Sequence, residues 1–180
     1  MTKNECISPK LHTITTYQST GFPIWLWFDH IKDLGGDVCL FIEKRIPKDG
    51  IQTTLKIPVV ALDRIYAGTL LMAEYIPSDN TIVIDDIWIW NNAPFNKPYK
   101  TRYELLKFIT TEIISHIDLY SWAKIILKPI TTNPSECPYE PKGIEYRNPS
   151  GLLLEPIWFE QFKQNPIYTL KKHLHLTPVS

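Results

Sequence analysis

Two runs of Ile, Val, Leu and aromatic residues, 69–76 and 81–90, flank the turn-forming sequence Pro-Ser-Asp-Asn. Two such runs around a turn predict a β-hairpin. Three carboxylates interrupt the apolar pattern: Glu74 in the first run, and Asp85 and Asp86 in the second. Residues two apart share one face of a strand, so Glu74 and Asp86 lie together beside large apolar side chains if the two faces coincide. The hairpin therefore carries either a functional pair of carboxylates or a charged sheet edge.

The same pattern predicts the other elements. Residues 22–28 are apolar on both faces, which is typical of a central strand and places Trp25 and Trp27 in the core. Residues 99–119 repeat apolar side chains at helical spacing, which predicts one long amphipathic helix. Further strands are predicted over 15–18, 38–43, 51–57, 123–128, 143–147 and 152–159, and a short helix over 168–174. This order favours an α+β fold with a mostly antiparallel sheet.

The length of 180 residues suffices for one domain with a substantial core. We expect residues 1–13 to be a polar lead-in and residues 14–180 to form a single domain. An apolar fraction of 44% with six tryptophans excludes a disordered chain. The 19 basic residues balance the 19 acidic ones, so no net charge draws the protein to nucleic acid or to anionic lipid.

Cysteine usage favours an intracellular location, cytoplasmic or nuclear. Cys6, Cys39 and Cys137 are widely spaced and odd in number, so neither a disulfide framework nor a zinc site is expected. The sequence has no signal-peptide core and no apolar run approaching the roughly 18 residues of a membrane helix, so no membrane contact is expected. It also lacks a phosphate-binding glycine loop and a nucleophile elbow, and its five histidines are scattered.

The hairpin and its surroundings resemble the nucleotidyltransferase domain of mRNA guanylyltransferases and ATP-dependent DNA and RNA ligases. Residues 69–76, T-L-L-M-A-E-Y-I, are similar to that family's T-L-L-D-G-E strand. The other matching segments follow the family's order: Q-S-T-G at 18–21, then 82–95, Arg102, 124–130, 142–149 and Trp158. The resemblance covers about residues 15–160. It implies a nucleotidyltransferase-like fold, and we expect no OB-fold lid because the last motif lies near the end of this sequence.

The residues that the family's reaction needs are replaced. That reaction uses a lysine nucleophile that forms a lysyl–nucleotide adduct, carboxylates that hold a divalent metal, and lysines that contact the phosphates. Gln18 stands at the position of this lysine, and its amide cannot act as the nucleophile. The resemblance therefore implies a fold kept without the reaction, with no cofactor and no metal. The replacements are Gln18 for the nucleophile, Met72 and Ala73 for an Asp-Gly pair, Lys142 for an acidic residue, and Ile157 and Phe159 for two lysines.

A non-catalytic member of this fold, the trimethylguanosine cap-binding domain of snurportin, is similar in two places. Its D-x-x-x-W-x-x-x-P-F pattern is matched by Asp86, Trp90, Pro94 and Phe95, and its G-W-L segment is matched loosely around Trp158. The tryptophan of that segment stacks on the methylated guanine, and a cationic purine is attracted to an indole face. The alternative role for Trp158, and for Trp88 and Trp90, is packing in the core.

The sequence therefore predicts a pseudoenzyme that binds a purine nucleotide or an RNA 5′ end. The candidate ligand-binding residues are Gln18, Glu74, Asp86, Arg102, Lys142 and Trp158. A second hypothesis is an interaction or assembly module with a protein partner and no remaining ligand site. An active guanylyltransferase or ligase fragment is the least favoured hypothesis. The Ile-, Asn- and Lys-rich sequence with a degenerate capping-like domain would fit a large DNA virus as the source.

Overall fold

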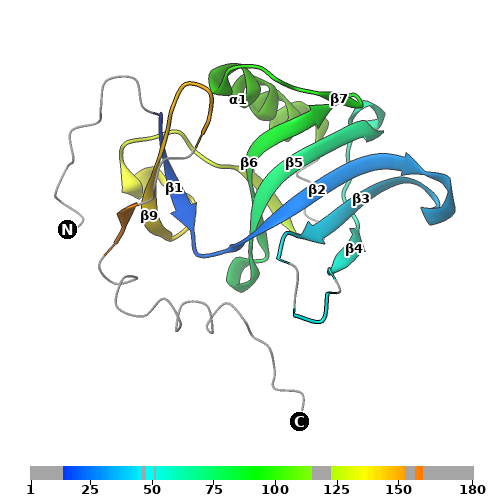
Figure 1. Cartoon of the computed structure of the whole chain (residues 1–180), viewed down its shortest axis with the longest axis horizontal. Helices are drawn as coiled ribbons and strands as arrows, with labels where there is room; N and C mark the ends of the chain where they lie inside the picture. The colour runs from blue at the N-terminus through cyan, green and yellow to red at the C-terminus, as the bar shows by residue number, and fades with distance from the viewer. Residues whose placement is uncertain (1–13, 46–47, 51, 115–122, 153–156, 160–180) are drawn as a thin grey trace, which may run out of the picture. The chain divides into compact units, whose positions relative to one another are not determined.

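A computed structural model of the chain describes most of its residues (Figure 1). The described residues are 14–45, 48–50, 52–114, 123–152 and 157–159. The chain divides into two compact units: unit 1 contains residues 1–22 and 129–180, and unit 2 contains residues 23–128. The lead-in and the short helix predicted over 168–174 lie outside the described residues. The single domain over 14–180 stays a prediction.

Unit 2 is built on a seven-stranded sheet (Figure 1) with the order β4-β3-β2-β5-β6-β7, in which β8 also pairs with β6. The pairs β2–β3, β3–β4, β5–β6 and β6–β7 are antiparallel, and β6–β8 is parallel. The predicted α+β class with a mostly antiparallel sheet is therefore confirmed. The strands are β2 Phe22–Ile31, β3 Gly36–Glu43, β4 Thr54–Ile57, β5 Ala67–Ile76, β6 Thr81–Trp90, β7 Ala93–Pro94 and β8 Lys124–Leu127, and the 3₁₀ turns are Lys32–Leu34, Asp63–Tyr66 and Pro77–Asp79.

Strands β5 and β6 form the predicted hairpin. Its turn ends at Asn80, which adopts a left-handed conformation with φ 47°. The ladder contains two register shifts, which insert Asp85 and Trp88 as extra residues on β6. Such β-bulges bend a strand and change which face its side chains reach. The simple alternation used to place the carboxylates therefore does not hold along β6.

Helix α1 spans Tyr99–Phe108 and continues as a π-helical turn over Ile109–Ile113. The helix begins where the periodicity predicts it and ends earlier than residue 119. Ile114 has extended dihedral angles and forms a β-bridge with Ala61, so the helix ends before it, and residues 115–119 of the predicted helix lie outside the described residues. The helix connects β6 to the parallel β8, because parallel neighbours need a crossover connection. Its buried residues are Tyr99, Leu106, Ile109, Thr110 and Ile113.

The two faces of β2 differ in burial. Ile24, Leu26 and Phe28 are fully buried, whereas Trp25 is only half-buried and Trp27 is 37% exposed. The prediction that both tryptophans lie in the core is therefore wrong, because the second face of this strand is open. The strand also continues to Ile31, past the predicted end at 28, because its last residues still pair with β3. Core packing is likewise wrong for Trp88, which is 53% exposed.

Unit 1 contains a three-stranded antiparallel sheet with the order β1-β9-β10. The strands are β1 Ile14–Ser19, β9 Pro141–Arg147 and β10 Ile157–Trp158, and a 3₁₀ turn spans Pro134–Glu136. The strands predicted over 15–18 and 143–147 are confirmed. Of the strand predicted over 152–159, only 157–158 is a strand among the described residues.

Cys39 on β3 is 2% exposed, and this burial raises the pKa of its thiol well above the usual range. The thiolate is the reactive form, so a buried and protonated thiol reacts slowly with alkylating reagents. We expect iodoacetamide at mildly alkaline pH to modify the half-buried Cys137 before Cys39. Peptide mass spectrometry measures both rates. Equal rates for Cys39 in the native protein and in guanidinium chloride would contradict its burial.

Candidate functional site

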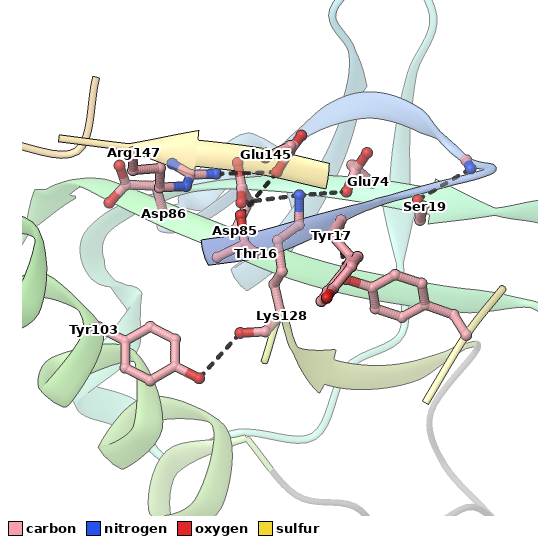
Figure 2. A network of polar contacts seen from close by, with 12 residues as sticks. Thr16, Tyr17, Ser19, Glu74, Asp85, Asp86, Tyr103, Lys128, Glu145 and Arg147 are labelled. Atoms are coloured by element: carbon pink, nitrogen blue, oxygen red, sulfur yellow. Dashed lines mark hydrogen bonds and ion pairs between the residues drawn. The ribbon is translucent and has the colours of Figure 1, made fainter. Parts of the chain in front are cut away.

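A buried lysine follows β8 and lies between two carboxylates (Figure 2). Nζ of Lys128 is 2.7 Å from Oε2 of Glu74 on β5 and 3.1 Å from Oδ1 of Asp85 on β6. The lysine side chain is 1% exposed and each carboxylate side chain is 9% exposed. The backbone N–H of Lys128 donates to the carbonyl of Ile84 at 2.8 Å, which extends the pairing of β8 with β6 and fixes the lysine beside them. We call these three side chains the Lys128 cluster.

The bulge at Asp85 decides the membership of this cluster. The sequence grouped Glu74 with Asp86, two residues that a regular hairpin would place on one face. The structure groups Glu74 with Asp85 instead, because Asp85 is the extra residue of the bulge. The missed cation had one sequence signal, since Lys128 directly follows the uncharged apolar run 125–127.

Asp86 forms a two-pronged ion pair with Arg102 of helix α1. Nε of Arg102 donates to Oδ1 at 2.8 Å, and Nη2 donates to Oδ2 at 2.9 Å. The pair is largely buried, with 13% of the arginine side chain and 8% of the aspartate side chain exposed. Nη1 donates to the carbonyl of Lys97 at 2.6 Å, and the N–H of Ile87 donates to Oδ1 of Asp86 at 2.8 Å. These contacts join α1 to β6 inside unit 2.

The other three candidate residues, Gln18, Lys142 and Trp158, belong to unit 1. Gln18 on β1 and Trp158 on β10 both pair with Gly143, which lies on the central strand β9. Lys142 comes directly before this glycine, and both Gln18 and Lys142 are half-buried. The structure therefore pairs the positions of Gln18 and Trp158 with one glycine, and Lys142 precedes that glycine at the register shift between β1 and β9. We call these three residues the Gly143 row.

Unit 1 also contains a buried polar group that the sequence did not single out (Figure 2). Oγ1 of Thr16 donates to Oε2 of Glu145 at 3.0 Å, and Nη2 of Arg147 lies 3.7 Å from the same oxygen. All three side chains are at most 7% exposed. The spacing of Glu145 and Arg147, two apart on a strand, was a signal that they share a face.

The chemistry of the unit 2 residues is that of internal charge pairing. Each of the three hairpin carboxylates lies against a cation of the same unit, Lys128 or Arg102. A divalent metal at Glu74 and Asp85 would compete with the ammonium group for the same oxygens. In the part of the chain that the structure describes, no three or more His, Cys, Asp or Glu side chains are grouped to hold a metal ion.

A scan against protein-family models and a search of curated proteins both found no match to this chain. The likeness to nucleotidyltransferases therefore rests on the motifs themselves. Within the described ranges, no helix combines the length and the apolar character needed to cross a membrane.

Proposed function

We propose that the chain is a nucleotidyltransferase-like domain that binds a purine nucleotide or an RNA 5′ end without transferring the nucleotide. The Lys128 cluster is the observation that supports the absence of transfer in this proposal. Glu74 matches a carboxylate of the family's motif, yet it and Asp85 lie 2.7 and 3.1 Å from a buried ammonium group. Displacing this ammonium by a metal would leave a charged lysine buried without its partners, which is strongly unfavourable. The cluster thus supports a structural rather than a metal-binding role for these carboxylates.

Ligand recognition falls, in this proposal, to the Gly143 row. The amide of Gln18 can donate to and accept from a purine edge or a phosphate, although it cannot form a covalent adduct. The ammonium of Lys142 offers a positive charge to a phosphate. The indole of Trp158 suits a cationic methylated purine. Glu74, Asp86 and Arg102, which the sequence grouped with these residues, then stabilise unit 2 through their ion pairs.

Incubation with radiolabelled GTP or ATP and a divalent metal tests the absence of transfer. We expect no label on the protein after acid treatment, because Gln18 stands where the nucleophilic lysine would be. A guanylyltransferase treated in parallel supplies the positive control. An acid-stable, protein-linked label on the unmodified chain would contradict the proposal.

Calorimetric titration with methylated and unmethylated guanine nucleotides tests binding. We expect Trp158→Ala to weaken the binding of methylated nucleotide by about tenfold, the loss typical of one aromatic contact to a base. Lys142→Gln should lower the affinity for each nucleotide, and the loss should increase with the charge of its phosphates. Phe108→Ala, which removes an aromatic side chain of unit 2 that is 39% exposed, is the matched control and should leave this affinity unchanged. No binding at millimolar nucleotide, or equal affinity in Trp158→Ala, would remove the proposal.

A further inference from the structure

Three tryptophans gather on one face of the sheet of unit 2. The rings of Trp25 on β2 and Trp88 on β6 meet edge to face, with centroids 5.0 Å apart and planes at 80°. Trp27 lies two residues from Trp25 and therefore shares its face of β2. Trp27 is 37% exposed and Trp88 is 53% exposed. We call these three residues the tryptophan face.

The strand between them continues the apolar surface. On β5, which lies between β2 and β6, half-buried Leu70 and Met72 alternate with fully buried Leu71 and Ala73. On β6, the bulge at Trp88 turns an apolar side chain outward, because Trp88 is the first exposed residue after the buried run 81–87. The tryptophan face therefore lies on β2 and β6, with the half-buried Leu70 and Met72 of β5 between them. Contiguous exposed apolar surface of this kind marks an interaction site.

Two lysines border the tryptophan face. Nζ of Lys44 lies over the ring of Trp25, 4.4 Å from its centroid. Lys56 on β4 pairs with Leu40 on β3, which in turn pairs with Trp27, so the three residues form one row across the sheet. Directly paired residues share a face. Asp29, two residues beyond Trp27, is the acidic residue of the same face of β2.

Exposed indole rings with neighbouring ammonium groups suit nucleic acid better than an apolar protein partner. Successive bases stack on aromatic rings, while cations beside the rings attract the phosphates. Sheets that present aromatic side chains to single-stranded RNA use this combination. An apolar protein surface, in contrast, would remove both ammonium groups from water without offering a counter-ion, and Lys56 would keep only its bond to the carbonyl of Leu34 at 2.7 Å.

We propose that the tryptophan face binds single-stranded RNA, with bases stacked on Trp27 and Trp88 and with Lys44 and Lys56 near the phosphates. The choice of RNA rests on the proposed function, since a protein that binds an RNA 5′ end must also accommodate the nucleotides that follow. Stacking accepts any base, so the binding should show little sequence preference. It should weaken steeply with salt because phosphate contacts release counterions.

Fluorescence anisotropy tests this with the full chain and a fluorescein-labelled oligouridylate that carries neither a cap nor a 5′ phosphate. At low salt we expect Trp88→Ala and Trp27→Ala each to weaken binding by about 5- to 150-fold, the range for loss of one stacked base. Trp88→Phe keeps an aromatic ring and should retain most of the affinity. Replacing Lys44 and Lys56 by glutamine should flatten the dependence of affinity on salt.

Two controls separate this inference from the proposed function. Leu62→Ala removes another apolar side chain that is 52% exposed, and it should leave RNA binding unchanged. Trp158→Ala should lower the affinity for methylated nucleotides and leave the affinity for the uncapped oligonucleotide unchanged. If the unmodified chain binds the oligonucleotide but no methylated nucleotide, only the proposed function is contradicted. If it binds the methylated nucleotide but not the oligonucleotide, only the inference is contradicted. The inference also fails if Trp27→Ala and Trp88→Ala bind RNA as tightly as the unmodified chain. It fails too if the unmodified chain does not bind RNA but forms a dimer in light scattering that these variants disrupt.

Discussion

Replacing Lys128 by methionine will lower the free energy of unfolding by about 3–5 kcal/mol, the usual cost of removing one partner from a buried ion pair. Glu74 and Asp85 would stay 9% exposed but lose the ammonium that lies 2.7 and 3.1 Å from them. The two carboxylates would then repel each other across the β5–β6 ladder. Urea denaturation followed by circular dichroism measures the change. Such a loss is a large part of the roughly 5–15 kcal/mol that stabilises a typical domain.

Lys107→Met is the matched control for this substitution. Lys107 also lies 2.7 Å from a carboxylate, that of Glu104, but the two side chains are 49% and 69% exposed. An exposed pair of this kind contributes at most about 1 kcal/mol. Adding Glu74→Gln and Asp85→Asn to Lys128→Met should recover part of the loss, because the uncompensated charges are then absent. Equal stability of Lys128→Met and Lys107→Met would show that the Lys128 cluster does not stabilise unit 2.

Arg102→Met will lower the free energy of unfolding by about 2–3 kcal/mol, because hydrogen bonds to a charged group are among the stronger ones and Asp86 would remain buried. The substitution removes both prongs of the ion pair and the bond to the carbonyl of Lys97. The N–H of Ile87 still donates to Asp86, which limits the loss. Urea denaturation again measures it.

A double-mutant cycle with Asp86→Asn isolates the pair itself. We expect the losses of unfolding free energy in the two single variants, added together, to exceed the loss in the double variant by about 1–3 kcal/mol. The reason is that substitutions of contacting residues are not additive. Arg64→Met removes an arginine that lies over Phe108 on the surface, and it should change stability little. If Arg102 instead serves a ligand, Arg102→Met will weaken nucleotide binding and leave stability unchanged. That result would return Asp86 and Arg102 to the ligand site.

The elements of this chain follow from local patterns. The run 81–90 is rich in Ile and Val, and its neighbour 69–76 is separated from it by turn formers, so the hairpin needs no distant contact to be predicted. The start of α1 is equally local, because the apolar spacing changes at residue 99. The end of α1 does not follow from a local pattern. Ile114 pairs with Ala61, a residue that sequence spacing cannot connect to it.

The candidate site was predicted less completely than the fold. Gln18 and Trp158 both pair with Gly143, and Lys142 precedes this glycine, but a ligand site shared by the six candidate residues stays a prediction. The grouping of Glu74 with Asp86 depended on regular alternation, which the bulge at Asp85 breaks. Burial of Trp27 and Trp88 was expected from their apolar character, yet nothing in the described residues covers that face enough to bury them.

The sequence by itself determined the order of most strands along the chain, the hairpin, the start of helix α1 and the mostly antiparallel character of the sheet. These properties follow from the period of apolar residues and from turn formers, which act over a few neighbouring positions. Only the tertiary structure decided that Lys128 neutralises Glu74 and Asp85, that Arg102 holds Asp86, and that three tryptophans share an open face. The physical reason is that such contacts join residues distant along the chain, and one bulged residue in a ladder redirects the side chains that follow.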